Sequence, residues 1–118
     1  MPKSLNEKKC AACEGGVPAL ADEEIRRLLL QLHPGWLVSG SGKSITRTFE
    51  FSNFKETMRF VNAVADIAES EGHHPDMGVH YARVEVKFST HAVGGLTEND
   101  FICACKIDVV TKLNGENA

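Results

Sequence analysis

Four of the chain's five histidines lie between Glu69 and Asp100, and three of them, His73, His74 and His91, are candidates for a common site. An unshifted imidazole titrates near neutral pH, so a cluster of histidines can donate and accept protons under cellular conditions. The same residues could hold a divalent metal ion, or they could be ordinary polar histidines of the surface. Neighbours in an extended segment point in opposite directions, which makes it awkward for His73 and His74 to bind one ion together. The residue types therefore leave an acid/base site and a metal site open.

The apolar pattern around these histidines predicts a strand pair that brings them together. A strand alternates its faces with period two, and a two-residue loop at Ala82–Arg83 puts the apolar side chains of both strands on one face. The apolar pairs are then Tyr81 with Val84, Val79 with Val86, and Met77 with Phe88. Carried outward, this register sets His74 opposite His91, and opposed side chains lie roughly 5 Å apart at Cβ. We therefore expect the histidines to cluster at the open end of a hairpin.

The pair His73–His74 also lies at a predicted junction between a helix and a strand. Pro75 disfavours the α conformation for the residue before it and starts an extended segment. Gly72 suits the left-handed position that follows the end of a helix. Such a junction is a common place for a functional site.

Together these residues match a known pattern. Glu69, the sequence His73-His74-Pro75, Tyr81, His91 and Asp100 are separated in turn by three, five, nine and eight residues. This spacing closely resembles the signature of the pterin-4a-carbinolamine dehydratases, and the similarity extends from about Ala21 to the C-terminal helix. The resemblance implies a dehydratase that converts 4a-hydroxytetrahydrobiopterin to quinonoid dihydrobiopterin in tetrahydrobiopterin recycling. It implies neither a cofactor nor a metal.

The resemblance assigns roles to the matching residues. The catalytic acid/base set would be His73, His74 and His91. The hydroxyls of Ser89 and Thr90 would line the pterin pocket beside them. This small-molecule substrate is the partner that the resemblance implies.

Three further positions are implied as substrate-binding or supporting residues. Glu69 and Asp100 would orient the imidazoles or tune their pKa values, and Asp100 could equally be a capping residue of the last helix. Trp36 matches a tryptophan near the family's pocket, although a plain core position explains it as well. Gly72 and the pair Ala92–Val93 depart from residues that animal members carry, but neither departure touches the histidines.

A binding module is the alternative function. Some members of this family stabilise the dimer of a homeodomain transcription factor through a helical surface that also serves self-assembly. The last helix has one apolar stripe at Phe101 and Ala104 and another at Ile102, Cys105, Val109 and Leu113. Two apolar sides indicate that one faces the core and the other a partner subunit. We therefore also expect a homo-oligomer, a dimer or a tetramer.

Composition narrows the class of protein. The formal charge of −3 argues against a nucleic-acid surface, which would be basic. No apolar run approaches the length of a membrane span, and no signal peptide follows the N-terminus, so we expect a cytoplasmic protein. Its four cysteines are then expected to be reduced thiols.

The rest of the chain predicts the elements that position the site. Residues 1–19, with Cys10 and Cys13 in a CxxC motif, indicate a flexible tail; no second motif completes a zinc site. The run Ser39-Gly-Ser-Gly-Lys43-Ser44 lacks the first glycine of a phosphate loop and precedes a strand pattern, so it reads as a hairpin turn. Helices are predicted from Asp22 to Leu32, from Asn53 to about Ala68, and from Thr97 to Asn114–Gly115.

These elements define the predicted fold. Their order is α-β-β-α-β-β-α, with the first two strands at residues 36–38 and 45–51. Two hairpins separated by a helix predict an α+β domain over residues 20–115. Its four-stranded, mainly antiparallel sheet would carry the helices on one face.

Overall fold

The computed structural model describes residues 4–11 and 18–113 of the chain. The helices are α1 (Asp22–Leu29), α2 (Phe54–Glu71) and α3 (Glu98–Leu113), with short 3-10 turns at η1 (Leu5–Glu7) and η2 (His91–Val93). The strands are β1 (Leu37–Val38), β2 (Ile45–Glu50), β3 (Asp76–Val79) and β4 (Arg83–Phe88). The predicted α+β class and the predicted order of helices and strands are both confirmed.

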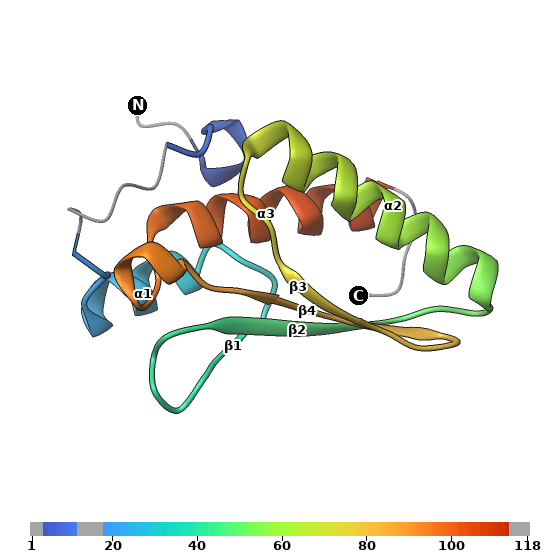
Figure 1. The fold of residues 1–118 in the computed structure, drawn as a ribbon, viewed down its shortest axis with the longest axis horizontal. Helices are drawn as coiled ribbons and strands as arrows, with labels where there is room; N and C mark the ends of the chain where they lie inside the picture. The colour runs from blue at the N-terminus through green and yellow to red at the C-terminus, as the bar shows by residue number, and fades with distance from the viewer. Residues whose placement is uncertain (1–3, 12–17, 114–118) are drawn as a thin grey trace.

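The four strands form one antiparallel sheet in the order β1-β2-β4-β3. The helices lie together on one face of this sheet, and the other face is left without a helix (Figure 1). The strands therefore alternate, with Val84, Val86 and Phe88 of β4 buried and the residues between them exposed. This one-sided burial follows from the period of two in an antiparallel strand.

Helix α2 begins and ends as its sequence predicts. The Asn53 side chain accepts a hydrogen bond from the Glu56 N–H at 2.9 Å, which caps the first turn. Gly72 closes the helix in the left-handed conformation, with φ of +66°. This glycine turns the chain so that His73 follows the helix directly into the sheet region.

Helix α3 is enclosed more completely than its two apolar stripes suggested. It packs against α2, α1 and η1, and its residues Phe101, Ile102, Cys103 and Ala104 are all buried. Ile102 is only 2% exposed, so this member of the stripe expected to face a partner lies in the core of the monomer instead. The reason is the N-terminal segment, which covers a side of α3 that the predicted three-helix arrangement left open. Cys105 and Val109 are half-buried, and the side chain of Leu113 lies outside the described residues.

The β3–β4 hairpin forms, but its register differs from the predicted one by two residues. The observed pairs are Val79 with Val84 and Met77 with Val86. The turn is Tyr81–Ala82, closed by a 2.8 Å hydrogen bond from the His80 N–H to the Arg83 carbonyl. A shift of two keeps every side chain on its face, so the apolar pattern alone could not distinguish the two registers.

Contacts outside the hairpin explain the observed register. The Tyr81 carbonyl accepts a hydrogen bond from the Thr57 hydroxyl at 2.9 Å, and the Ala82 carbonyl accepts one from the Phe51 N–H at 2.9 Å. The Tyr81 ring stacks on Phe54, with centroids 6.4 Å apart. Tyr81 therefore belongs to a turn anchored on α2 and not to the ladder.

The N-terminal segment, for which the sequence indicated a flexible tail, makes specific contacts where the structure describes it. Leu5 is 1% exposed and belongs to the core, and η1 packs against α3. The second cysteine of the CxxC motif, Cys13, and the predicted helix end at Asn114–Gly115 lie outside the described residues. Helix α1 ends at Leu29, three residues before the predicted end at Leu32. The residues from Leu30 to Leu32 form tight turns held by backbone hydrogen bonds. No helix in the described part of the chain is long and apolar enough to cross a membrane.

Candidate active site

His73 is buried at the junction of α2 and β3. Its side chain is 9% exposed, and its ring stacks in parallel on Phe88, with centroids 5.9 Å apart. Its Nε2 lies 2.6 Å from Oδ1 of Asp100. Because a carboxylate accepts hydrogen bonds, this contact places the ring proton of His73 on Nε2.

Asp100 joins the two halves of the histidine motif. Its Oδ2 accepts hydrogen bonds from the Thr90 hydroxyl at 2.9 Å and from the Thr97 N–H at 3.0 Å, while Oδ1 accepts the bond from His73. The bond to Thr97 is the cap of α3, so the capping role and the orienting role considered for Asp100 occur together. The carboxylate is completely buried. It therefore holds His73 and the residue before His91 in one rigid cluster.

His74 points the other way and is exposed. Its side chain is 59% exposed, and its Nε2 lies 2.5 Å from Oε2 of Glu69. Glu69 is itself 77% exposed, so this pair orients the imidazole in contact with solvent. The predicted association of Glu69 with the histidine pair is thus made by His74.

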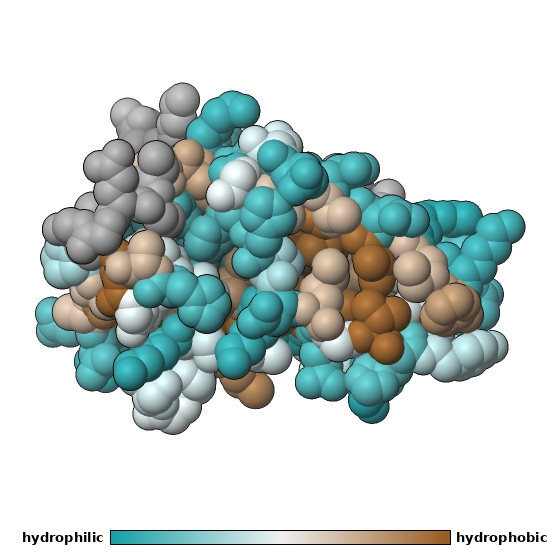
Figure 2. Space-filling view, in the orientation of Figure 1, coloured by the Kyte–Doolittle hydropathy of each residue, from teal (hydrophilic) through white to brown (hydrophobic). Residues whose placement is uncertain are grey.

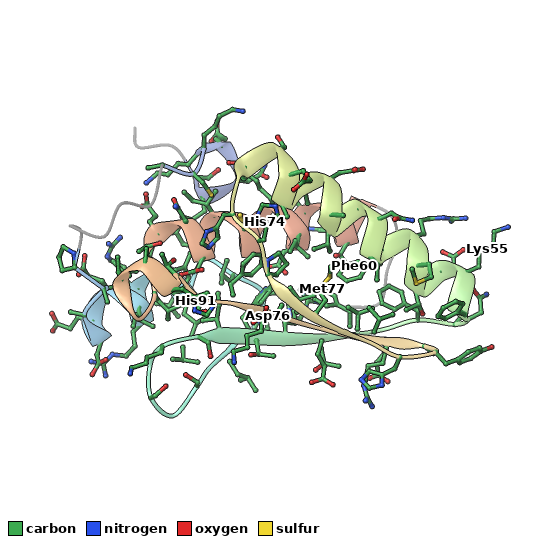
Figure 3. The ribbon with its side chains drawn as sticks, in the orientation of Figure 1. Lys55, Phe60, His74, Asp76, Met77 and His91 are labelled. Atoms are coloured by element: carbon green, nitrogen blue, oxygen red, sulfur yellow. The ribbon has the colours of Figure 1, made fainter. Side chains whose placement is uncertain are left out.

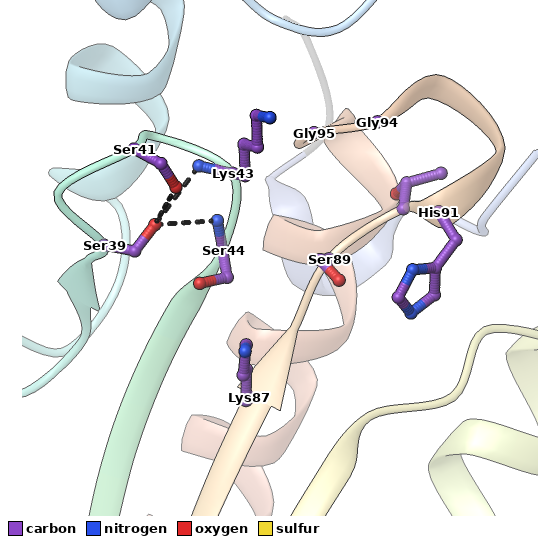
Figure 4. Close-up of a pocket in the computed structure, with 10 residues that line it drawn as sticks. Ser39, Ser41, Lys43, Ser44, Lys87, Ser89, His91, Gly94 and Gly95 are labelled. Atoms are coloured by element: carbon purple, nitrogen blue, oxygen red, sulfur yellow. Dashed lines mark hydrogen bonds between the residues drawn. The ribbon is translucent and has the colours of Figure 1, made fainter.

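His91 lines a hollow at the end of the sheet. The hollow measures about 370 Å³ and is bounded by the β1–β2 loop on one side and the β4–α3 connection on the other. Its lining residues are Ser39, Ser41, Lys43, Ser44, Lys87, Ser89, Thr90, His91, Gly94 and Gly95. Figure 4 shows Lys43 and Ser44 on the β1–β2 loop, and Ser89 and His91 at the end of β4. We call this cavity the Ser89–His91 hollow.

The hollow is polar and carries positive charge. Its walls hold hydroxyl groups and two lysines, Lys43 and Lys87, and no carboxylate among the described residues. Thr90 is 3% exposed, and its hydroxyl donates a hydrogen bond to Asp100. Ser89 is half-buried, and its hydroxyl forms no hydrogen bond with the described residues. Ser89 is therefore the more accessible hydroxyl, and Thr90 positions the carboxylate behind it.

The structure brings the motif together, but not as a single ring of imidazoles. His74 lies near the C-terminal end of α2, and both it and His91 are far from Lys55 at the opposite end of this helix (Figure 3). His73 lies behind them, linked to the His91 segment through Asp100 and Thr90. The observed β3–β4 register, carried outward, sets His73 opposite Thr90 and His74 opposite Ser89. One imidazole is thus buried and two face solvent.

Trp36 lies in the core and not at the histidines. It is 2% exposed, packs on Phe49 and Phe88, and donates its indole N–H to Oδ1 of Asp108 at 2.9 Å. Asp108 also pairs with the buried guanidinium of Arg47. Burial lowers the pKa of Arg47, and the charge of Asp108 opposes that shift. Trp36 is linked to the site through Phe88, because Phe88 packs against Trp36 and stacks on the ring of His73.

The arrangement suits proton transfer. Two imidazoles reach solvent at the edge of the fold, and the third is held by a buried carboxylate. Among the described residues no group of three or more histidine, cysteine, aspartate or glutamate side chains is arranged to hold a metal ion. Histidines paired with carboxylates can donate and accept protons near neutral pH.

Several residues of the site escaped sequence reasoning. The sequence predicted Phe88, which stacks on His73, as a core residue alone. It predicted the loop from Ser39 to Ser44 as a hairpin turn with no role in the site. The β2–β4 ladder pairs Ile45 with Phe88, which carries Ser44 to the position beside Ser89. The small polar residues and the lysine of that loop could have indicated a binding loop. Only the order of strands in the sheet shows that the loop lies beside Ser89 and His91.

Fold and site together define a small α+β protein that pairs histidines with carboxylates at one end of its sheet. The sequence profile of the family Pterin 4 alpha carbinolamine dehydratase matches residues 18–110, which include every residue of this site. The chain therefore belongs to the pterin-4a-carbinolamine dehydratase family.

Individual relatives agree with this assignment. A relative from Nitrosomonas eutropha, named for the same family, is 53% identical over 106 residues, covering 90% of this chain and 92% of its own. One from Legionella pneumophila is 53% identical over 108 residues, covering 92% and 96%. The crystal structure of a transcriptional coactivator/pterin dehydratase from Brucella melitensis matches with a TM-score of 0.74 and 34% identity, over 78% of this chain and 97% of that one. A pterin dehydratase-like RuBisCO assembly factor of the alpha-carboxysome, 22% identical with a TM-score of 0.57, shares the fold.

Proposed function

We propose that this protein is a 4a-hydroxytetrahydrobiopterin dehydratase, a hydro-lyase that forms quinonoid dihydrobiopterin and water. The observation that carries the proposal is the chain of hydrogen bonds from His73 through Asp100 to Thr90. It joins the two separate parts of the histidine motif beside a hollow that His91 lines. The family membership of the chain supports the same reaction.

In this reaction the hydroxyl on C4a leaves as water and a ring N–H of the pterin loses its proton. The first event needs an acid and the second a base, and both can be imidazoles at neutral pH. We assign the proton transfers to His74 and His91, because both are exposed to solvent and therefore reachable by substrate. His73 completes the acid/base set from behind, with its proton fixed on Nε2 by Asp100.

The Ser89–His91 hollow is the proposed place of the substrate. Its volume of about 370 Å³ lies within the range of roughly 300–1,000 Å³ that small-molecule sites occupy. Hydroxyls and lysines on its walls match the nitrogen and oxygen atoms around a pterin ring. Ser89 would donate to the ring. His74, which Glu69 orients, is not among the described residues that line the hollow, so it would act on a part of the substrate that extends beyond it. Trp36 would act on the site only indirectly, by packing against Phe88.

We further propose that the protein serves tetrahydrobiopterin recycling in the cytoplasm, as a homodimer or homotetramer. Exposed apolar side chains support an oligomer: Phe54, Val79 and Tyr81 are 49%, 42% and 69% exposed. Figure 2 shows apolar side chains gathered on the visible face between α2 and the β3–β4 hairpin. Burial of such a patch against a second copy would remove apolar area from water.

A dimerisation or coactivator module is the second candidate. The Brucella protein is described as a transcriptional coactivator as well as a pterin dehydratase. Here the buried position of Ile102 removes part of the α3 stripe that such a role would use. The exposed patch of Phe54 and Tyr81 is the surface that remains for it.

Stopped-flow dehydration of 4a-hydroxytetrahydrobiopterin tests the proposal. The wild-type protein should accelerate the loss of the carbinolamine, and His74→Ala should lower kcat/KM by about 10²-fold or more. His80→Ala is the matched control, because His80 is half-exposed on the hairpin turn and forms an ion pair with Glu85, at 3.4 Å, away from the candidate site. A folded wild-type protein without any acceleration would refute the enzyme and favour the binding module.

A further inference from the structure

The N-terminal segment is attached at several points to the elements that carry the candidate site. The Cys10 N–H donates to Oε1 of Glu71 at 2.8 Å, one residue before the glycine that ends α2. The Lys106 ammonium of α3 donates to the Asn6 carbonyl at 2.6 Å. Leu5 is buried between them in the core. Residues 4–11 therefore hold a defined position against α2 and α3.

A second pair of bonds fixes the backbone next to Cys10. The Ala11 N–H donates to Oδ1 of Asn99 at 3.0 Å, and Nδ2 of Asn99 donates to the Ala11 carbonyl at 2.7 Å. Asn99 is buried, so this two-bond contact is shielded from water. Cys10 is thus held between Glu71 on one side and Asn99 on the other.

This attachment brings two thiols into contact. Sγ of Cys10 lies 3.5 Å from Sγ of Cys103, which is completely buried in α3. Cys10 is half-buried and is the member of the pair that a reagent from solvent can reach. The two sulfurs also approach the carbonyls of Asn99, at 3.7 Å, and His73, at 4.0 Å. The thiol pair therefore lies directly behind the His73–Asp100 contact.

We propose that Cys10 and Cys103 are a redox modification site that forms an intramolecular disulfide when the protein meets a peroxide. The two sulfurs, 3.5 Å apart, must approach to about 2.0 Å for the bond to form. The disulfide would link the N-terminal segment covalently to α3 behind the candidate site. The inference rests on the thiol geometry and is independent of the dehydratase proposal.

The chemistry assigns different roles to the two thiols. Cys10, as thiolate, attacks one peroxide oxygen; the O–O bond breaks, an S–O bond forms, and the departing hydroxide takes up the thiol proton as water. Cys103 then attacks the Cys10 sulfenic sulfur; the S–O bond breaks, and the hydroxide leaves with the Cys103 proton as a second water. The two thiols lose two electrons in total, and the peroxide is reduced to two waters. The hydrogen bond with Cys10, and then burial, raise the pKa of the Cys103 thiol, so Cys103 is not the thiol that the peroxide oxidises first.

The chain offers competing thiols that make the assignment testable. Cys13 completes a CxxC motif with Cys10, and Cys105 follows Cys103 by two residues on α3. Residues i and i+2 of a helix point to different faces, so Cys105 does not face Cys103. Cys13→Ser and Cys105→Ser are therefore matched controls that should retain the proposed disulfide.

The experiment treats the reduced full-length chain with hydrogen peroxide and follows intact mass, thiol count and peptide maps. The expected product has lost two hydrogens, retains two of its four thiols, and yields one linked peptide containing Cys10 and Cys103. Dithiothreitol should reverse the change. The oxidised protein should also unfold at a higher temperature than the reduced one, because the link constrains the unfolded chain.

Cys10→Ser is the decisive variant, because a half-buried residue at the N-terminal segment can change without opening the core. It should abolish the linked peptide and slow the oxidation of Cys103 at least about tenfold, since the buried thiol loses its reactive partner. A Cys10–Cys13 peptide in its place would overturn the proposal. So would a linked Cys10–Cys103 peptide that forms only after unfolding in urea.

Discussion

Replacing Asp100 by asparagine tests whether the buried carboxylate orients His73. The side chain keeps its shape, and its amide oxygen can still accept from the Thr97 N–H and the Thr90 hydroxyl. The amide NH₂ then faces Nε2 of His73, where the native carboxylate accepts a bond at 2.6 Å. Two donors cannot share this contact, so His73 must lose its Nε2 proton and carry it on Nδ1.

The expected magnitude follows from that one bond. A hydrogen bond to a charged group contributes about 1.5–3 kcal/mol, and one between neutral groups about 0.5–1.5 kcal/mol. The difference of about 1–1.5 kcal/mol should appear as a loss of kcat/KM of roughly 5- to 13-fold, since about 1.4 kcal/mol is tenfold. The free energy of unfolding should fall by a similar amount.

Three measurements separate orientation from instability. Stopped-flow dehydration gives kcat/KM, its pH profile reports the altered imidazole, and the ¹⁵N shifts of His73 report the tautomer directly. Asp108→Asn is the matched control: it makes the same change on the same helix, in a network with Trp36, Arg47 and the His33 N–H that does not include His73, His74 or His91. It should destabilise the fold and leave kcat/KM unchanged. An Asp100→Asn protein with wild-type kcat/KM, or with a loss no larger than the control, would refute the reasoning.

Three further outcomes are expected. Ser89→Ala removes one accessible hydroxyl from the hollow, so KM for the pterin should rise about 2- to 10-fold at constant kcat, measured by steady-state dehydration. Asp108→Ala leaves the guanidinium of Arg47, 2% exposed, without its counter-charge and should cost about 3–5 kcal/mol in urea unfolding. The raised pKa of Cys103 keeps that thiol protonated in the folded chain where the unfolded chain ionises, from its ordinary value of 9.0 upward. The free energy of unfolding should therefore fall with rising pH above about 9, by up to about 1.4 kcal/mol per unit, and Cys103→Ala should remove this slope.

Each of these outcomes has a clear contrary result. A change in kcat for Ser89→Ala would mean that the hydroxyl takes part in the chemical step and not only in binding. A cost below about 1 kcal/mol for Asp108→Ala would mean that water or another group compensates Arg47. An equal alkaline slope in Cys103→Ala would assign it to other titrating groups.

The sequence predicted most of the fold, because its elements are encoded by local patterns. The capping asparagine Asn53, the left-handed glycine Gly72 and the strand alternation of β4 each act within a few residues. The spacing of the histidines, Glu69 and Asp100 predicted the family, and the pairing of His74 with Glu69 agrees with the role expected for that glutamate. The dual role of Asp100 was also among the predicted possibilities.

Long-range contacts decided what local patterns could not. The β3–β4 register moved by two residues because Tyr81 and Ala82 are anchored on α2 and β2, a shift that leaves the apolar faces unchanged. Ile102 of the second α3 stripe is buried in the monomer, and residues 5–7 pack against this helix.

What the sequence determined by itself is the order of helices and strands and the set of residues able to move protons, since both depend on neighbours along the chain. Only the tertiary structure decided that His73 is buried against Asp100 while His74 and His91 remain exposed. It also decided that a serine-rich loop closes the hollow and that Cys10 meets Cys103. These pairings join residues up to 93 positions apart, and their geometry depends on how the helices and the sheet pack around them.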